Sequence, residues 1–231
     1  MIVVFAQEHD ENARSLVRRW RDRGARLMVP RDLSRAGWRC LSDDPDHSRC
    51  VVDGAVYDSS EIEGVLIRLP AILASDLPQI ALADRNYVAS EMTAFLVYWL
   101  NSLRKPVLNR PTPRSLAGPG WYPEHWIYHA AKAGLRVRPI SRSVKFTSID
   151  QPAWPGHSGA YAELSVVGAS CFGDSAAGLA AKAHILAKAA GVDLVKFRFD
   201  GSGDDACFLQ ADLCPTLDEP RVEQAVLDYF A

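Results

Sequence analysis

The sequence predicts a mixed fold, with an α/β first part and an α+β second part. Residues 2–6 are a continuous apolar run, which is typical of a strand buried on both faces of a sheet, and residues 64–70 predict another buried strand that proline ends. The N-terminal order of strand, helix and strand favours a right-handed crossover and therefore a parallel sheet. Near the other end, two strand-like runs flank a Gly-Ser-Gly-Asp-Asp turn at 201–205, which indicates an antiparallel hairpin.

The first elements follow from apolar spacing and from residues that end helices. After the strand at 2–6, residues 9–12 offer capping side chains for a helix that Gly24 ends, and 25–29 supply a second strand. The apolar positions of that helix are Ala13, Leu16, Val17 and Trp20. The turn after residue 6 lacks a glycine-rich phosphate fingerprint, so the sequence gives no support for NAD binding.

The middle of the chain predicts a hairpin, a long helix and a short strand. Residues 50–57 are two short strands around Asp53-Gly54, a dipeptide that favours hairpin turns. Residues 84–103 have the spacing of the longest helix, and 105–111 resume as a strand that proline closes.

A loop rich in Pro, Gly and Ser at 112–120 is the best candidate boundary. We therefore expect an N-terminal α/β domain over 1–111 and a C-terminal half over 112–231. In that half the pattern predicts, in order, a helix at 122–133, strands at 135–140 and 143–147, a loop at 150–159, strands at 161–167 and 171–172, a helix at 175–190, strands at 192–199 and 206–212, and a helix at 219–230.

Composition excludes several classes of partner and location. The 231 residues are 48% hydrophobic and 23% charged, with a formal net charge of -2, so nothing points to nucleic acid or an anionic membrane. No apolar run reaches the roughly 20 residues of a membrane helix. Residues 1–7 lack a basic leader, and the 5 cysteines form no Cys-x-x-Cys pair. These features predict a soluble cytoplasmic protein.

Four stretches resemble the ATP-grasp family, especially carboxylate–amine ligases such as ribosomal-protein glutamate ligases and peptide-maturation ligases. They are a strand that ends in arginine, a helix with a glutamate before a strand of the valine-x-asparagine-x-proline type, a helix end, and a C-terminal core. In this sequence they read Gly64–Arg68, Glu91 with Pro106–Pro111, Ala130–Leu135, and Leu186–Asp193 with Phe208–Pro215. The resemblance implies an ATP-grasp-like core behind a pre-ATP-grasp parallel sheet, with ATP and Mg²⁺ as cofactors.

The chain departs from that family at the metal and at the lid. Family members hold Mg²⁺, which prefers oxygen ligands, with an aspartate and then a glutamate and an asparagine two residues apart. The aligned positions here are Arg198, Gln210 and Asp212; a shift of two would bring Asp200 into play. About 25 residues after Leu135 replace a separate lid domain, so we expect the lid to be missing or reduced. Family members hold the phosphates with two lid lysines, and this sequence offers a candidate for the second of them only, Lys145.

These departures favour a divergent protein that has lost ATP-dependent ligation and binds a small molecule, a peptide or a protein in the former active-site cleft. We then expect no cofactor and no metal. The alternative is an active ATP- and Mg²⁺-dependent ligase with a metal site rebuilt from Asp212 and either Asp193 or Asp200. A serine or cysteine hydrolase or transferase is a third reading, although no Gly-x-Ser-x-Gly motif is present. A reduced lid would leave apolar surface that a second subunit could cover, which leaves room for a homodimer.

The expected ligand-binding residues combine strand ends with the altered metal positions. Arg68 ends a probable parallel strand, where ligands bind in open sheets, or forms an ion pair with Glu91 or Asp84. Arg198 is expected to bond to Asp212 or Gln210, so that its guanidinium replaces the metal charge. The full set is Arg68, Glu91, Asn109, Arg110, Lys145, Arg198, Gln210 and Asp212. No catalytic residue is assigned.

Overall fold

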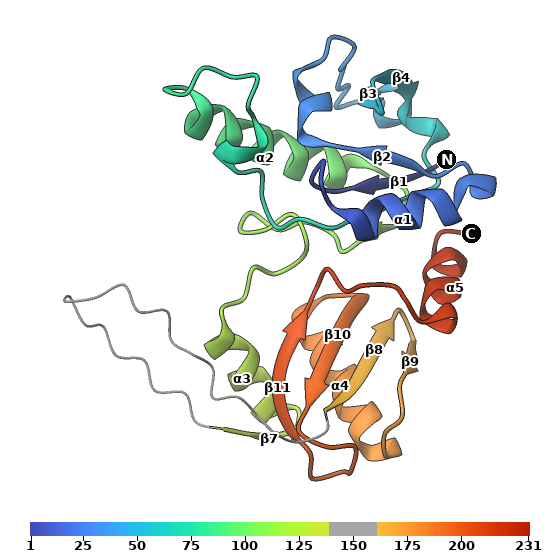
Figure 1. Ribbon diagram of the computed structural model, residues 1–231, viewed down its shortest axis with the longest axis vertical. Coiled ribbons are helices and arrows are strands. Elements are labelled where there is room, and N and C mark those ends of the chain that lie inside the picture. The colour runs from blue at the N-terminus through green and yellow to red at the C-terminus, as the bar shows by residue number, and fades with distance from the viewer. Residues whose placement is uncertain (139–160) are drawn as a thin grey trace.

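A computed structural model of the protein describes residues 1–138 and 161–231. Within these ranges the chain forms a four-stranded sheet, a five-stranded sheet and a separate two-stranded hairpin (Figure 1). The mixed α/β architecture that the sequence predicts is confirmed.

The four-stranded sheet is parallel throughout, as the N-terminal pattern predicts. Its spatial order is β2 (Arg26–Met28), β1 (Ile2–Phe5), β5 (Gly64–Ile67) and β6 (Val107–Leu108). Helix α1 (Glu11–Arg19) begins at Asp10, whose carboxylate accepts a hydrogen bond from the Ala13 N–H. The predicted hairpin forms from β3 (Arg49–Val52) and β4 (Ala55–Asp58). At its turn Asp53 and Gly54 have φ values of 51° and 74°, the left-handed conformation that this tight connection needs.

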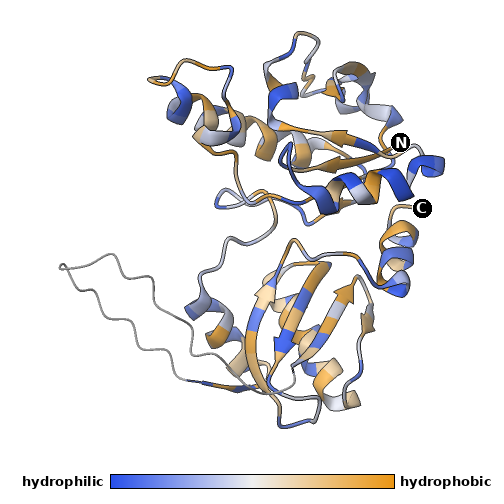
Figure 2. Cartoon of the chain, in the orientation of Figure 1, coloured by the Kyte–Doolittle hydropathy of each residue, from blue (hydrophilic) through white to orange (hydrophobic). Residues whose placement is uncertain are grey.

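Alternate residues of this sheet pack into two different cores. Val3, Phe5 and Val65 face α2 (Arg85–Ser102), while Ile2 and Val4 face α1 and α5 (Pro220–Tyr229). Because both faces are covered, β1, β5 and β6 are buried along their whole length, whereas the edge strand β2 begins at exposed Arg26; Figure 2 shows the sheet mostly orange.

The five-stranded sheet has two helices on one face, while α5 meets the end of the other face at Val167 and Leu194. Its order is β7 (Arg136–Val137), β11 (Cys207–Asp212), β10 (Leu194–Phe199), β8 (Ala162–Val167) and β9 (Ser170–Phe172). Only the β7–β11 pair is parallel. Helices α3 (Pro123–Lys132) and α4 (Ala177–Ala190) pack on the apolar face, around Phe197, Phe199 and Phe208. Blue and orange alternate along β10 and β11 in Figure 2, as expected for a sheet with one wet face.

Helix α5 ends the chain but packs against the first sheet. Phe230 lies against β5 at Gly64, where any Cβ would collide with the phenylalanine ring. The indole Nε1 of Trp20 donates a 2.6 Å hydrogen bond to Glu223 of α5. The hydrophobic core behind α1 and α5 also takes in Val167 and Leu194 of the second sheet. The division into domains 1–111 and 112–231 stays a prediction.

Several expectations fall on residues 139–160, outside the described ranges. They are the strand at 143–147, the loop at 150–159 and Lys145. The whole connection from the end of β7 to the start of β8 spans only 138–161, less chain than a separate domain of about 50 residues requires. Among the helices that the structure describes, none has both the length and the apolar character for crossing a bilayer.

Candidate functional site

Six polar side chains share the face of the five-stranded sheet that lies opposite α3 and α4. Strand register brings them together, because Arg198 lies between Glu163 and Gln210, and Lys196 between Ser165 and Asp212. Side chains two residues apart on a strand point to the same face. We call this set the polar sheet face: Glu163, Ser165, Lys196, Arg198, Gln210 and Asp212.

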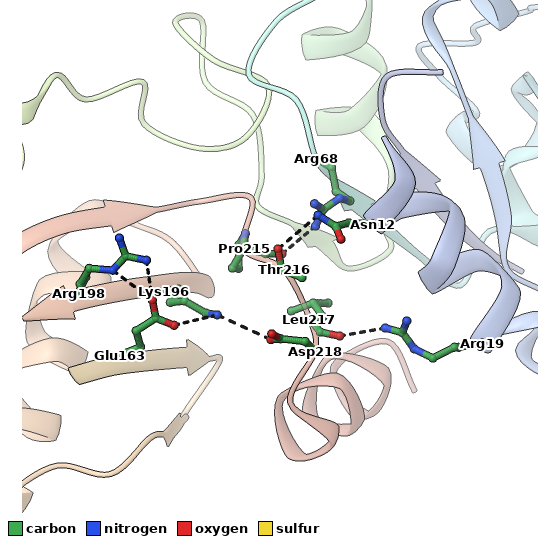
Figure 3. Close-up of polar contacts among 10 residues, drawn as sticks. All are labelled: Asn12, Arg19, Arg68, Glu163, Lys196, Arg198, Pro215, Thr216, Leu217 and Asp218. Carbon is green, nitrogen blue, oxygen red and sulfur yellow. Dashed lines mark hydrogen bonds and ion pairs between the residues drawn. The ribbon is translucent and has the colours of Figure 1, made fainter. Parts of the chain in front are cut away.

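Glu163 is the centre of charge pairing on the polar sheet face (Figure 3). Its Oε1 accepts hydrogen bonds of 2.7 Å from Nη2 and 3.1 Å from Nε of Arg198. Its Oε2 lies 3.3 Å from Nζ of Lys196, which is also 3.9 Å from Oδ1 of Asp218. The Arg198 guanidinium lies over the ring of Tyr161, 5.6 Å from its centroid. One carboxylate thus holds two cations side by side.

The two cations change the ionisation of Glu163. The hydrogen bonds from Arg198 lower the pKa of this carboxyl below its usual value; burial opposes them less strongly, and the positive charge of Lys196 adds to the lowering. Glu163 therefore remains ionised over the whole neutral range and somewhat into acid.

The prediction that Arg198 bonds to Asp212 or Gln210 is wrong. Arg198 lies directly across from Gln210, yet its guanidinium turns to Glu163 on the other neighbouring strand. A carboxylate is a stronger acceptor for guanidinium than a neutral amide, which explains the choice. Asp212 lies across from Lys196 instead, and its Oδ1 accepts a 2.9 Å hydrogen bond from the Cys214 N–H.

Asp200 is one of the two carboxylates that the active-ligase alternative would add to Asp212 in a metal site. In the structure it closes the β10–β11 connection. Its Oδ1 accepts from the Cys207 N–H and its Oδ2 from Nη2 of Arg138, both at 2.7 Å. Across residues 1–138 and 161–231, no group of three or more His, Cys, Asp or Glu side chains could hold a metal ion.

Arg68 does follow a parallel strand, but it is sealed inside the protein. Its Nε lies 2.9 Å from Oδ2 of Asp10. Figure 3 shows its other contact, in which Nη1 donates a 2.8 Å hydrogen bond to the Pro215 carbonyl. The Arg68 side chain is only 6% exposed. Its ion-pair partner is therefore Asp10, whereas the sequence suggested Glu91 or Asp84. The chain's own segment after β11 fills the sheet edge where open α/β sheets bind ligands.

Asn109 is a buried link between the two sheets. Its Nδ2 donates to the Leu194 carbonyl at 2.7 Å, and its Oδ1 accepts from the N–H groups of Leu194 and Asp193. The amide completes the backbone bonding of the start of β10. These hydrogen bonds give Asn109 a structural role, so its presence here requires no ligand.

Arg110 and Glu91 lie away from the polar sheet face. The guanidinium of Arg110 donates to the carbonyls of Leu100 and Leu103 at the end of α2, and to Lys105. Glu91 is exposed on α2 and makes no hydrogen bond or ion pair with the described residues. Lys145 lies outside the described residues; of the other seven expected residues, the structure brings together only Arg198, Gln210 and Asp212.

Glu163, Ser165 and Lys196 are the residues of the polar sheet face that the sequence analysis missed. The alternation of Leu194–Phe199 already puts Lys196 on the face of Arg198. Glu163 has no local signal, because its place beside Arg198 depends on the pairing of β8 with β10.

Solved structures share this arrangement over the whole chain. The macrocyclase MdnC from Microcystis aeruginosa, bound with precursor peptide MdnA, superposes with a TM-score of 0.73 at 11% identity, covering 100% of this chain and 99% of that one. The ATP-grasp ligase PsnB, complexed with minimal precursor, Mg and ADP, gives 0.66 at 12%, covering 100% and 97%. The chain has the ATP-grasp fold. A RimK domain ATP-grasp protein from Sphaerobacter thermophilus gives 0.52 at 16% identity, covering 99% and 98%.

Sequence comparison alone finds no such relation. No family model matches the chain, and no curated protein matches it. The ATP-grasp fold is therefore retained here with a sequence far from that of its structural neighbours.

The polar sheet face does not fit the Mg²⁺ that accompanies nucleotide in the PsnB complex. A hard dication requires several oxygen ligands, yet Lys196 and Arg198 stand on β10 and use the carboxylate of Glu163. The positive charges of Lys196 and Arg198 would repel a metal cation beside them, so a metal would have to displace both side chains. The position that the resemblance assigns to a metal-binding aspartate holds a guanidinium.

Removing Arg198 is expected to change stability little. The side chains of Arg198 and Glu163 are each 40% exposed, and ion pairs of this kind contribute about 0–1 kcal/mol. Arg198→Ala should therefore unfold in urea within about 1 kcal/mol of the wild type. In a carbon-13 NMR titration the pKa of Glu163 should rise toward its usual value. The lowered pKa makes Glu163 stabilising at neutral pH, and this contribution disappears as pH falls through that pKa. A loss of several kcal/mol, or an unchanged titration, would contradict the pairing.

Proposed function

We propose that this ATP-grasp-fold protein binds a peptide on its polar sheet face and does not catalyse ATP-dependent ligation. The loss of ligation is supported by the cations on β10, where Arg198 stands at the position that the resemblance assigns to a metal-binding aspartate. Lys196 and Arg198 share Glu163, and Asp200 is engaged by Arg138 and the Cys207 N–H. An intact metal site would need those carboxylates free.

The proposal of a peptide ligand rests on two neighbouring hydrogen-bonding groups, the guanidinium of Arg198 and the side-chain amide of Gln210. Arg198 directs Nε and Nη2 to Glu163, and its Nη1 has no acceptor among the described residues. Gln210 lies directly across from it, exposed and likewise without a hydrogen-bond partner in those ranges. Two adjacent groups of this kind on an open face suit an acidic side chain together with a peptide amide. The neighbours MdnC and PsnB are both described in complex with precursor peptides, which supports the same class of ligand.

The compartment in which the protein works is part of the same proposal. The cysteines of the chain are all unpaired, which suits a reducing compartment, so we place the protein in the cytoplasm. Homodimer formation stays a prediction.

Selection from a random peptide library displayed on phage tests peptide binding. We expect enriched peptides to share an acidic residue and to lose at least about tenfold in affinity, or 1.4 kcal/mol, against Arg198→Glu. Lys188→Glu is the matched control, since it reverses an exposed charge on α4, behind the sheet. Peptides that bind both variants equally, or a library that yields no enrichment, would contradict the proposal. Thermal melting of each variant shows that it remains folded.

A further inference from the structure

A pocket lies where the two sheets and the C-terminal helix meet. Its volume is about 280 Å³. It is lined by residues from β6 and the chain around it, the turn between α4 and β10, and the end of α5: Pro106, Val107, Arg110, Gly191, Asp193 and Tyr229. None of them belongs to the polar sheet face.

Asp193 presents a fixed carboxylate in this pocket. Its N–H donates to Asn109 at 3.0 Å, and its carbonyl accepts from the Gly168 N–H at 2.7 Å. The hydroxyl of Tyr229 donates a 2.8 Å hydrogen bond to Oδ2. Burial and this hydrogen bond raise the pKa of Tyr229 to about 12, so the phenol keeps its proton at neutral pH. No cation of the described chain lies within ion-pair distance of Asp193.

Arg110 presents a fixed positive charge in the same pocket. Carbonyl oxygens of Leu100, Leu103 and Lys105 hold Nη1 and Nη2 at 2.8–3.3 Å, which leaves Nε–H without an acceptor in residues 1–138 and 161–231. No carboxylate in those ranges pairs with it. Arg110 and Asp193 therefore line one pocket with opposite charges, and each is held by other bonds instead of by its counterpart.

We propose that this pocket binds a free α-amino acid with a small apolar side chain. The ligand carboxylate lies toward Arg110 and its ammonium toward Asp193, so that each charge gains the counter-ion it lacks. Pro106 offers apolar surface for the side chain, and a Cβ at Gly191 would meet nothing within 4 Å, so there is room beside it. A peptide terminus carries only one of the two charged groups, which is why a free amino acid is the better match.

Binding of L-valine, followed by NMR chemical shifts of the full chain, tests the proposal. We expect saturable shifts at residues that line the pocket, and binding at least about tenfold weaker for N-acetyl-L-valine, L-valinamide and the dipeptide glycyl-L-valine. These three probes remove the ammonium, remove the carboxylate and separate the two groups. Equal binding of all four compounds, or no saturable shift with L-valine, would overturn the proposal.

Asp193→Asn is the variant that isolates the carboxylate. Its amide oxygen can still accept from Tyr229, so the local hydrogen bond remains while the charge is lost. We expect at least about tenfold weaker valine binding, whereas Asp228→Asn, which removes a neighbouring exposed charge on α5, leaves binding unchanged. Wild-type affinity in Asp193→Asn would contradict the site. Neither result depends on peptide selection at the polar sheet face, so the two proposals can fail separately.

Discussion

Asn109→Ala is expected to destabilise the protein by about 3 kcal/mol. The Asn109 side chain, which belongs to a residue only 1% exposed, makes three hydrogen bonds to the backbone at the start of β10. Each such bond contributes about 1 kcal/mol, and removal leaves buried backbone groups without partners. In a chain of this size that loss corresponds to a melting temperature lower by about 6–12 °C.

Asn12→Ala is the matched control for this substitution. Asn12 is also an asparagine that joins the two parts of the chain, but it is exposed and its contact with Thr216 is long, at 3.4 Å. We expect urea unfolding of this control to lie within about 0.5 kcal/mol of the wild type. If the two alanine variants were equally stable, Asn109 would not be the link that we describe.

Arg68→Met is expected to cost about 3–5 kcal/mol, because removal of one partner leaves a charge without compensation in a buried pair. Arg68 and Asp10 have side chains 6% and 18% exposed, and their charged atoms are 2.9 Å apart. Methionine keeps most of the apolar stem but neither the charge nor the hydrogen bond to Pro215. Urea unfolding measures the difference.

The surface pair Arg49–Asp58 supplies the comparison. Its side chains are 55% and 51% exposed at 3.3 Å, so Arg49→Met should cost no more than about 1 kcal/mol. The double variant Arg68→Met/Asp10→Asn should recover part of the loss, since asparagine still caps α1 and no unpaired charge remains. An Arg68→Met protein as stable as Arg49→Met would show that the buried pair is not a stabilising contact.

The fold was largely predictable because its signals are local. Apolar runs gave the strands of the first sheet, Asp53-Gly54 gave the hairpin, and glycines such as Gly134 and Gly191 ended helices at positive φ. The order of strand, helix and strand was sufficient for a parallel sheet.

The site was harder to predict because it depends on which strands become neighbours. Arg198 has a strand on each side, and sequence order favoured β11, the next strand along the chain, over β8, which supplies Glu163. Arg68 was expected to meet acids near it on the long helix, but the β1–α1 connection brings Asp10 to the same sheet edge. Long-range pairing of this kind leaves no mark in local periodicity.

Thermal melting with and without millimolar Mg-ATP tests the central claim most directly. A specific nucleotide site at a hundredfold excess of ligand over its dissociation constant would stabilise the protein by about 2.7 kcal/mol. Because Arg198 stands at the position that the resemblance assigns to a metal-binding aspartate, and Lys196 beside it shares Glu163, we expect no shift of that size. A clear melting shift that requires both ATP and Mg²⁺ would contradict the account and favour an active ligase.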